Sequence, residues 1–145
     1  MKCPSGVETS TWRVRVAYVD TDQGGIVHHA TYLRYLEQAR IEHMRTRGLS
    51  YRVMEQDDKL ALPVVETQLK YRAPARFDDS LEIETWIGSI NRAKLRFDSI
   101  IRCEGRVLTQ AQISLACIRL PEGRITSIPQ VLWTLAAGAL APKHP

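Results

Sequence analysis

The sequence predicts an α+β fold in which a five-stranded antiparallel sheet wraps around one long helix, with a short helix at the C-terminus. One long stretch has the helical period, and most of the remaining chain alternates between apolar and polar residues. The connections between the alternating stretches are short, which favours antiparallel pairing. One helix cannot cover both faces of such a sheet, so we expect the sheet to curve around it and to leave its edges for a partner subunit.

The first predicted strand follows a polar segment, residues 1–11, that we expect to be loose. From Trp12 to Tyr18 apolar residues alternate with Arg13 and Arg15, as in a half-buried strand. The strand is expected to end at a turn that runs from Asp20 to Gly25.

The long helix is predicted to begin near Ala30 and to end before Gly48, a length of roughly 18 residues or about 27 Å. Thr31 is the best capping residue nearby, either at the N-cap or already inside the first turn. Arg45 and Arg47 suit the negative end of the helix. The apolar stripe recurs at steps of three and four residues, at Tyr32, Tyr35, Leu36, Ala39, His43 and Met44.

After a polar connection at residues 50–59, four alternating stretches predict the remaining strands. They are residues 65–72, 81–87, 93–102 and 107–120, separated by turns that contain Pro74, Asp78, Asp79, Arg92, Glu104 and Gly105. Pro129 can start the terminal helix, which we expect to extend through Leu140. No repeat or linker interrupts the chain, so residues 1–145 are expected to form one domain with its core at about residues 12–140.

The composition is that of an ordinary soluble globular protein, with 44% hydrophobic and 25% charged residues among 145. The net charge is +4, but the 20 basic residues are scattered among 16 acidic ones, so none forms a nucleic-acid-binding arm. A basic rim that attracts a small anionic molecule fits this distribution.

The three cysteines are odd in number and lack the CxxC spacing, which argues against a disulfide framework and against a zinc site. The N-terminal residues lack an apolar signal core, and no segment approaches the length of a membrane span. We therefore expect a cytoplasmic protein, for which a peripheral association with a membrane complex stays open.

The stretch from Asp20 to His29, DTDQGGIVHH, holds the candidate active site. Two carboxylates end a strand, two glycines make a flexible turn, and two histidines lead into the long helix. An anionic side chain is thereby placed beside the outward-pointing N–H groups of a helix start. That pairing suits acyl transfer, in which a carboxylate attacks or deprotonates water and N–H groups hold the oxyanion.

Asp22 is the candidate catalytic carboxylate, although an isolated Asp in a turn is more often a capping residue. The adjacent glycines, the downstream histidine and the helix start reverse that preference. Asp20 is expected to hold the turn, because two free carboxylates so close together would raise each other's pKa. Adjacent histidines rarely converge on one ion, so we expect no metal at His28 and His29.

The chain resembles a hotdog-fold acyl-CoA thioesterase of the 4-hydroxybenzoyl-CoA thioesterase family, in the branch associated with the Tol–Pal cell-envelope system. The resemblance rests on YVDTDQGGIVHHATY at residues 18–32, on YLEQAR at 35–40, and on YRAPARFDD at 71–79 followed by LEI at 81–83. It covers residues 12 to about 135.

The resemblance implies a catalytic role for Asp22, the second Asp of the D-x-D pair, and an auxiliary role for His29. It also implies that the backbone N–H of His29 polarises the thioester carbonyl, within an oxyanion hole at the helix start around His28 to Ala30. Gly24 and Gly25 would let the substrate approach the backbone closely. His28 departs from the family pattern, in which close relatives carry an aromatic residue, and this bears on the shape of the acyl pocket.

For coenzyme A, the resemblance points to basic residues near two turns, Arg72 and Arg76 in one and Arg92 and Lys94 in the other. A solvated basic surface is the ordinary alternative. The resemblance also implies that no cofactor or metal is needed, that active sites lie at the interface of a homodimer, and that dimers pair into tetramers. Some relatives use a helix carboxylate, for which Glu37 is the fallback.

The expected function is hydrolysis of an acyl-CoA to free acid and coenzyme A. The alternatives are a non-catalytic module that binds acyl-CoA or an acyl carrier, and a hotdog dehydratase that acts on 3-hydroxyacyl thioesters. Acyl selectivity depends on pocket walls from two subunits, for which the candidates are Tyr35, Leu36, Met44, Leu62, Pro63 and Val64.

Overall fold

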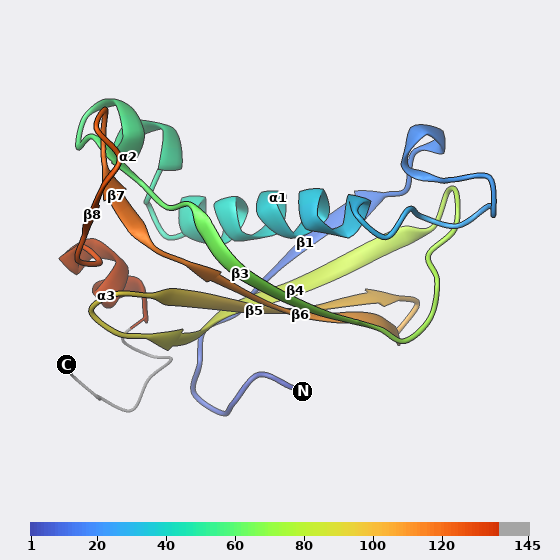
Figure 1. The fold of residues 1–145 in the computed structure, drawn as a ribbon. Coiled ribbons are helices and arrows are strands. Elements are labelled where there is room, and N and C mark those ends of the chain that lie inside the picture. Colours follow the sequence, from blue (N-terminus) through green and yellow to red (C-terminus); the bar gives the residue numbers. More distant parts are fainter. Residues whose placement is uncertain (137–145) are drawn as a thin grey trace.

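A five-stranded antiparallel sheet forms the body of the computed structural model, which describes residues 1–136 (Figure 1). The strand order is β1-β4-β5-β6-β3, so the first strand along the chain and β3 are the two edges. The five strands are β1 (Ser10–Arg15), β3 (Val64–Tyr71), β4 (Ser80–Ile90), β5 (Leu95–Cys103) and β6 (Arg106–Leu115). This sheet confirms the predicted fold class.

The long helix α1 (Thr31–Arg45) crosses one face of the sheet (Figure 1). The short helix α3 (Gln130–Ala136) lies at the end of the sheet near the β4–β5 hairpin, and its Leu132 and Ala136 join the same buried cluster as Tyr35 (Figure 1). Tyr35 and Leu36 on α1 are almost fully buried against the inner face of the sheet. Facing residues of the sheet include Ile83, Phe97 and Ile101, each no more than 1% exposed. Burial of such side chains is worth about 2 kcal/mol each, which is why the amphipathic stripe specifies this packing.

The predicted helix is three residues longer than the observed one. The helix starts at Thr31 and ends at the C-cap Thr46, and Gly48 adopts the left-handed conformation that ends many helices. The N-cap position is taken by Ala30, with no side-chain cap. Thr31 therefore lies inside the first turn, one of its two predicted positions.

The predicted first strand is wrong at its end, because β1 stops at Arg15 and a 3₁₀ turn, η1 (Tyr18–Asp20), follows. The Asp20 carboxylate accepts the Ala17 N–H at 3.0 Å, and the Asp20 N–H donates to the Ala17 carbonyl. These two hydrogen bonds curl the chain away from the sheet. Tyr18 is consequently 78% exposed instead of lying on the apolar face.

Two further predictions are wrong in the part of the chain that follows α1. Residues 50–59 include a short helix, α2 (Tyr51–Gln56), whose start is capped by the Ser50 hydroxyl. The long strand predicted for 107–120 breaks at Ala116, whose N–H donates to the Pro63 carbonyl. The remainder, β7 (Cys117–Arg119), joins a second small sheet with β2 (Leu60–Ala61) and β8 (Arg124–Thr126).

The terminal helix begins where Pro129 predicts it, and its last expected residues, 137–140, lie outside the described part of the chain. None of the helices within residues 1–136 combines the length and apolar character that a membrane crossing requires.

Candidate active site

A tight loop between β1 and α1 carries the candidate site. Within it the Asp22 N–H donates to the Ile26 carbonyl at 2.9 Å, and the Gly25 N–H donates back to the Asp22 carbonyl at 3.0 Å. Gly25 adopts φ +77°, which a side chain would disfavour. The Val27 N–H donates to the Ala75 carbonyl at 2.8 Å, so the loop is fixed to the segment between β3 and β4. The glycines thus make a turn that sets the position of Asp22.

Asp22 is exposed, and only one of its carboxylate oxygens has a protein partner among the described residues. That oxygen accepts the Gly24 N–H at 2.8 Å, which orients the carboxylate. A Cβ added at Gly24 would meet the same oxygen at 3.1 Å, so the small residue allows this close contact. The second oxygen is left for a substrate or a water molecule.

Asp20 has the opposite environment, since it is 4% exposed and fully engaged. It accepts hydrogen bonds from the Tyr35 hydroxyl at 2.7 Å and from the Ala17 N–H at 3.0 Å, and it forms an ion pair with Arg34. Burial and the neighbouring Asp20 charge together raise the pKa of Tyr35. Asp20 therefore holds the turn, as the sequence predicts.

The backbone N–H groups at the start of α1 are unequally available. The His28 N–H donates to the Asp20 carbonyl at 3.0 Å, and the Ala30 N–H donates to the His28 ring at 3.1 Å. None of the hydrogen bonds found among residues 1–136 uses the His29 N–H. Of the three candidate oxyanion donors, only His29 has its N–H unengaged in the structure.

Asp22 and His29 both line one cavity of about 380 Å³, at the N-terminal end of α1. Gly24, Gly25, His28 and Ala30 are not part of its wall. The His28 and His29 rings stack at 4.3 Å, and the Tyr71 hydroxyl donates to the His29 carbonyl at 2.9 Å. The other lining residues are Ile26, Val27, Tyr32, Tyr71, Arg72, Ala73 and Pro74.

Tyr71 and Tyr32 are residues of this cavity to which the sequence assigned no role. Their rings meet edge to face at 5.3 Å, and the Tyr32 hydroxyl accepts the Ala75 N–H at 3.2 Å. Tyr71 begins the block YRAPAR at residues 71–76, and in the sequence this block indicates the fold more than the site. Only the pairing of Ala75 with Val27 reveals that this block forms a wall of the cavity.

The four candidate residues for coenzyme A fall at two ends of the sheet. Arg72 lines the cavity, and its guanidinium donates to the Gln110 side chain. Arg76 is exposed and pairs through its backbone with Ile26 of the loop. Arg92 and Lys94 lie in the β4–β5 hairpin, which is at the Val64 end of β3. Arg72 follows the opposite end of β3, about 23 Å from Val64 at roughly 3.3 Å per residue.

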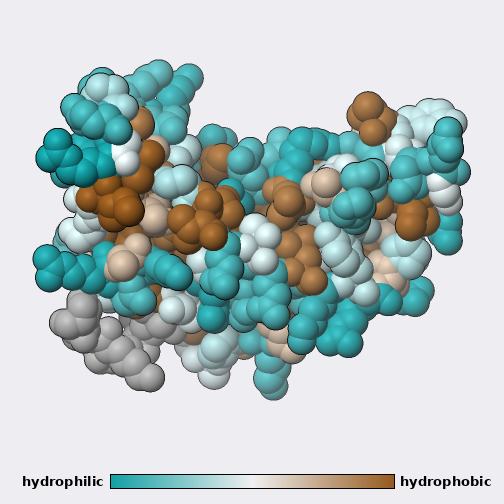
Figure 2. Space-filling view, in the orientation of Figure 1, coloured by the Kyte–Doolittle hydropathy of each residue, from teal (hydrophilic) through white to brown (hydrophobic). Residues whose placement is uncertain are grey.

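A second cavity of about 330 Å³ lies toward the C-terminal end of α1, between α1, α2 and the start of β3. It is lined by Met44, Leu62, Pro63 and Val64, four of the six residues predicted for the acyl pocket. The other two, Tyr35 and Leu36, are buried in the core and line neither cavity. Figure 2 shows apolar residues along this face of the molecule.

The charged guanidinium of Arg40, in the wall of this second cavity, is largely buried and has only a distant acidic partner. Its side chain is 10% exposed, and its nearest acidic partner is Glu37 at 4.0 Å. Burial lowers the pKa of Arg40, because the charged form loses hydration. Glu37, the fallback catalytic residue, has a side chain that is 60% exposed and belongs to this cavity rather than to that of Asp22.

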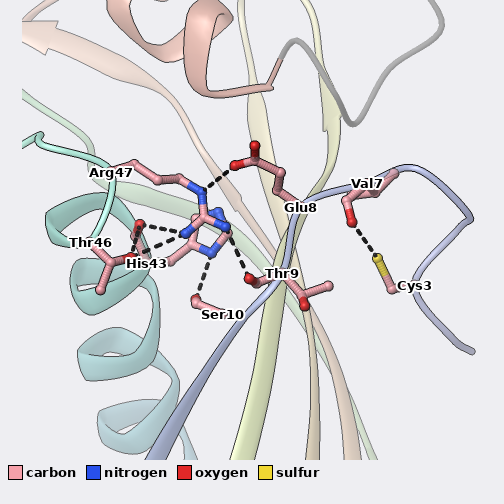
Figure 3. Close-up of polar contacts among 8 residues, drawn as sticks. All are labelled: Cys3, Val7, Glu8, Thr9, Ser10, His43, Thr46 and Arg47. Carbon is pink, nitrogen blue, oxygen red and sulfur yellow. Dashed lines mark hydrogen bonds and ion pairs between the residues drawn. The ribbon is translucent and has the colours of Figure 1, made fainter.

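A separate polar cluster ties the N-terminal segment to the far end of α1 (Figure 3). His43 is 1% exposed and shares a 2.7 Å hydrogen bond with the Ser10 hydroxyl. Arg47 forms an ion pair with Glu8 at 3.0 Å and donates to the carbonyls of Thr9 and His43. Burial, aided by the Arg47 charge, lowers the pKa of His43 to about 4. The cluster is structural and lies away from the cavity of Asp22.

No group of three or more His, Cys, Asp or Glu side chains suited to a metal ion occurs within the described residues. Cys3, Cys103 and Cys117 are all free thiols.

Comparison with known proteins adds a family to this geometry. The sequence profile described as the thioesterase-like superfamily matches residues 16–135. The acyl-CoA thioester hydrolase YbgC of Escherichia coli O157:H7 is 39% identical over 108 residues, which cover 74% of this chain and 80% of that protein. The acyl-CoA thioesterase YbgC of Haemophilus influenzae is 32% identical over 117 residues, which cover 81% and 86%.

A solved structure has the same architecture over nearly the whole chain. The 1,4-dihydroxy-2-naphthoyl-CoA thioesterase of Synechocystis superposes with a TM-score of 0.81 at 26% sequence identity. The superposition covers 95% of this chain and all of that one.

Proposed function

The chain belongs to the thioesterase-like superfamily, and from that membership we propose that it is an acyl-CoA thioesterase. It hydrolyses the thioester to a free acid and coenzyme A. The observation that carries this function is the pair of groups in one cavity wall, a carboxylate at Asp22 with one free oxygen and the unengaged N–H of His29.

Asp22 supplies the negative oxygen of the reaction. The Gly24 N–H holds one carboxylate oxygen, and the other has no hydrogen-bond partner among the described residues in this cavity wall. The carboxylate either takes a proton from water as water adds to the carbonyl carbon, or itself attacks that carbon to form an anhydride that water then opens. In both routes the C–S bond breaks and the coenzyme A thiolate leaves and takes up a proton.

These two routes differ in the origin of one oxygen atom. A single turnover in ¹⁸O-labelled water places the label in the product acid if Asp22 is a general base. If Asp22 is the nucleophile and water opens the anhydride at the Asp22 carbonyl, the label enters the Asp22 carboxylate and the first product acid is unlabelled. Label found by mass spectrometry in the peptide that contains Asp22 therefore identifies the nucleophilic route, whereas label in the first product acid fits a general base or opening of the anhydride at the acyl carbonyl.

The oxyanion is stabilised by the His29 N–H at the start of α1. This N–H has no internal partner among the described residues, and a helix start favours negative charge. The N–H groups of His28 and Ala30 serve the loop instead, through Asp20 and the His28 ring. The imidazole of His29 is an auxiliary group that orients water or protonates the leaving thiolate.

Coenzyme A is bound at the mouth of the cavity by Arg72 and Arg76. Both cations belong to the segment that is fixed to the Asp22 loop. Arg92 and Lys94 of the same chain lie too far along the sheet to reach the same nucleotide. They act on it only from a neighbouring subunit.

The proposed enzyme needs no cofactor and no metal, because Asp22 and the His29 N–H between them supply the base or nucleophile and the oxyanion site. We also propose a cytoplasmic homodimer with active sites at its interface, and pairing of dimers into a tetramer. The open edge of β3, next to both cavities, supports the dimer.

Thiol release from a panel of acyl-CoA thioesters tests this function. Aliphatic and hydroxylated aromatic acyl groups are both included, with free thiol detected by a chromogenic disulfide. The proposal predicts turnover of at least one member with stoichiometric free acid. Binding of acyl-CoA without release from any member would favour a binding module, and an enoyl product from a 3-hydroxyacyl thioester would favour a dehydratase.

A further inference from the structure

Tyr71, the last residue of β3, reaches the backbone just ahead of helix α1. Its hydroxyl donates to the His29 carbonyl at 2.9 Å, across 42 positions of sequence. Tyr71 and His29 both line the cavity of Asp22. Among the hydrogen bonds found within residues 1–136, this one alone joins residues 28–30 to a part of the chain other than the Asp22 loop and α1. This segment is thus tied to the sheet through one hydroxyl group.

The direction of the His29 N–H is set by the peptide groups on either side of this residue. A peptide group is planar, so a bond to its carbonyl also restrains the N–H at its other end. The peptide group that carries the His29 N–H has the His28 carbonyl at its other end, and this carbonyl accepts the Thr31 N–H at 2.9 Å. The first of the two peptide groups is therefore held within the turn that opens α1.

The second peptide group, between His29 and Ala30, is held at both of its polar ends. Its carbonyl accepts the Tyr71 hydroxyl at 2.9 Å, and its N–H donates to the His28 ring at 3.1 Å. His28 belongs to the same loop and moves with it, whereas Tyr71 belongs to a strand of the sheet. Only the bond from Tyr71 therefore fixes this peptide group relative to the rest of the cavity wall.

Tyr71 is itself held in place by its neighbours. It pairs with Thr109 of β6, and its ring meets the ring of Tyr32 edge to face at 5.3 Å. Tyr32 is 2% exposed, and its hydroxyl accepts the Ala75 N–H at 3.2 Å, so the Tyr71 ring rests on a well-packed side chain. Partial burial raises the pKa of Tyr71, so the hydroxyl keeps its proton and remains a donor at neutral pH.

We propose that Tyr71 is a positioning residue for the oxyanion site, whose hydroxyl fixes the backbone of His29 so that the His29 N–H faces the thioester carbonyl. This role rests on the proposed function, which assigns that N–H to the oxyanion. A donor stabilises the developing negative charge best when it is already oriented before the reaction begins. Because Tyr71 acts through His29 and not on the reacting atoms, its loss slows the chemical step and leaves substrate binding intact.

Removal of one hydroxyl group tests this role by kinetics. Tyr71→Phe keeps the ring against Tyr32 and loses only the bond to His29. We expect kcat for acyl-CoA hydrolysis to fall about tenfold, with KM changed by less than about twofold. Tyr18→Phe is the matched control, since Tyr18 is 78% exposed and its hydroxyl takes part in none of the hydrogen bonds found within the described residues. Thermal unfolding verifies that each variant is folded at the assay temperature.

A vibrational band of the bound substrate distinguishes positioning of the N–H from a general loosening of the fold. The Asp22→Asn protein is expected to hold acyl-CoA without hydrolysing it, so ¹³C labelling can identify the stretching band of the thioester carbonyl in infrared difference spectra. A hydrogen bond from the His29 N–H shifts this band below its frequency in free acyl-CoA. Addition of Tyr71→Phe is expected to return the band at least about half of the way to the free value.

Three results would overturn the positioning role of Tyr71. They are a kcat of Tyr71→Phe within about twofold of the parent, a raised KM at unchanged kcat, and a lowered kcat with the carbonyl band unmoved. Failure of the proposed function has a different signature, because the parent protein itself then releases no thiol from any acyl-CoA. In that case the carbonyl band of bound acyl-CoA still decides whether the Tyr71 hydroxyl directs the His29 N–H.

Discussion

Asp20 and Asp22 are two positions apart, yet their side chains have opposite fates. The carboxylate of Asp20 is buried under Tyr35 and Arg34, whereas that of Asp22 reaches the cavity with one oxygen free. A buried, fully bonded carboxylate contributes to stability, and an accessible one is available for chemistry. The two substitutions to Asn should therefore affect different measurements.

Asp20→Asn is expected to lower the free energy of unfolding by about 3 kcal/mol, because it leaves Arg34 without its ion pair and replaces an acceptor of the Tyr35 hydroxyl. Chemical denaturation at neutral pH measures the loss. Asp22→Asn is the control and should change the unfolding free energy by less than about 0.5 kcal/mol, as substitutions at exposed positions do. An equal loss in both variants would contradict the structural role of Asp20.

Reasoning from the residues separates the two aspartates, whereas among the three N–H groups only the family resemblance favours one, that of His29. Mutual repulsion of close carboxylates already argues that only one of Asp20 and Asp22 can be free. Which N–H is unengaged depends on the His28 ring, which folds back to accept from Ala30, and on the Asp20 carbonyl. Neither contact has a sequence signature, so the residues alone do not single out His29, and only the family resemblance points to its N–H.

Helix α1 serves two ends of the molecule. Its first turn closes the Asp22 cavity through Tyr32, and its last turn buries His43 against β1 and β5. The sequence placed His43 in the apolar stripe of the helix, and its burial confirms that position. Because His43 is buried there, the stability of the folded protein depends on the protonation of this side chain.

His43 should make the protein less stable in acid. Its pKa is about 4 in the folded protein and about 6.5 when unfolded, so the unfolded chain binds the extra proton between these values. The contribution is fully present above pH 6.5 and falls by up to roughly 3 kcal/mol as the pH drops toward 4. Comparison of unfolding free energies with His43→Gln, which lacks the titrating group, isolates the effect. Parallel pH profiles for the two proteins would refute it.

Among the elements, long periodic stretches were predictable and short or interrupted ones were not. Helix α1 and the strands β3, β4 and β5 follow from their periods. The six-residue helix α2 has too few residues for a period, and only the Ser50 cap marks its start. The break at Ala116 follows from its bond to Pro63, a contact between distant parts of the chain.

The whole molecule brings Arg72 and Asp22 into one cavity while Arg92 and Lys94 lie at the other end of the same sheet. The sequence proposed all four for coenzyme A. Because β3 and β4 run in opposite directions, the turn that follows each lies at an opposite end of the sheet. The strand order adds that β3 is an edge strand, separated from β4 by two strands.

Arg72→Ala should raise the KM for acyl-CoA about tenfold with little change in kcat, since the cation is expected to bind the nucleotide rather than the reacting carbonyl. The same acyl group on a short pantetheine thioester lacks the nucleotide phosphates and should show no such change. Arg13→Ala, at an exposed arginine on the opposite edge, is the matched control. An equal effect on both substrates would place Arg72 at the acyl group instead.

The measurement that tests the account most directly is thiol release by Asp22→Asn under saturating acyl-CoA. The substitution keeps an oxygen for the Gly24 N–H and removes the negative charge, so the loop and the fold should persist. We predict that kcat falls at least about a thousandfold while the thermal stability is unchanged. Asp20→Asn is the control, and at a low temperature at which it is folded it should retain most of its activity. Turnover by Asp22→Asn within tenfold of the parent would contradict the assignment of this carboxylate.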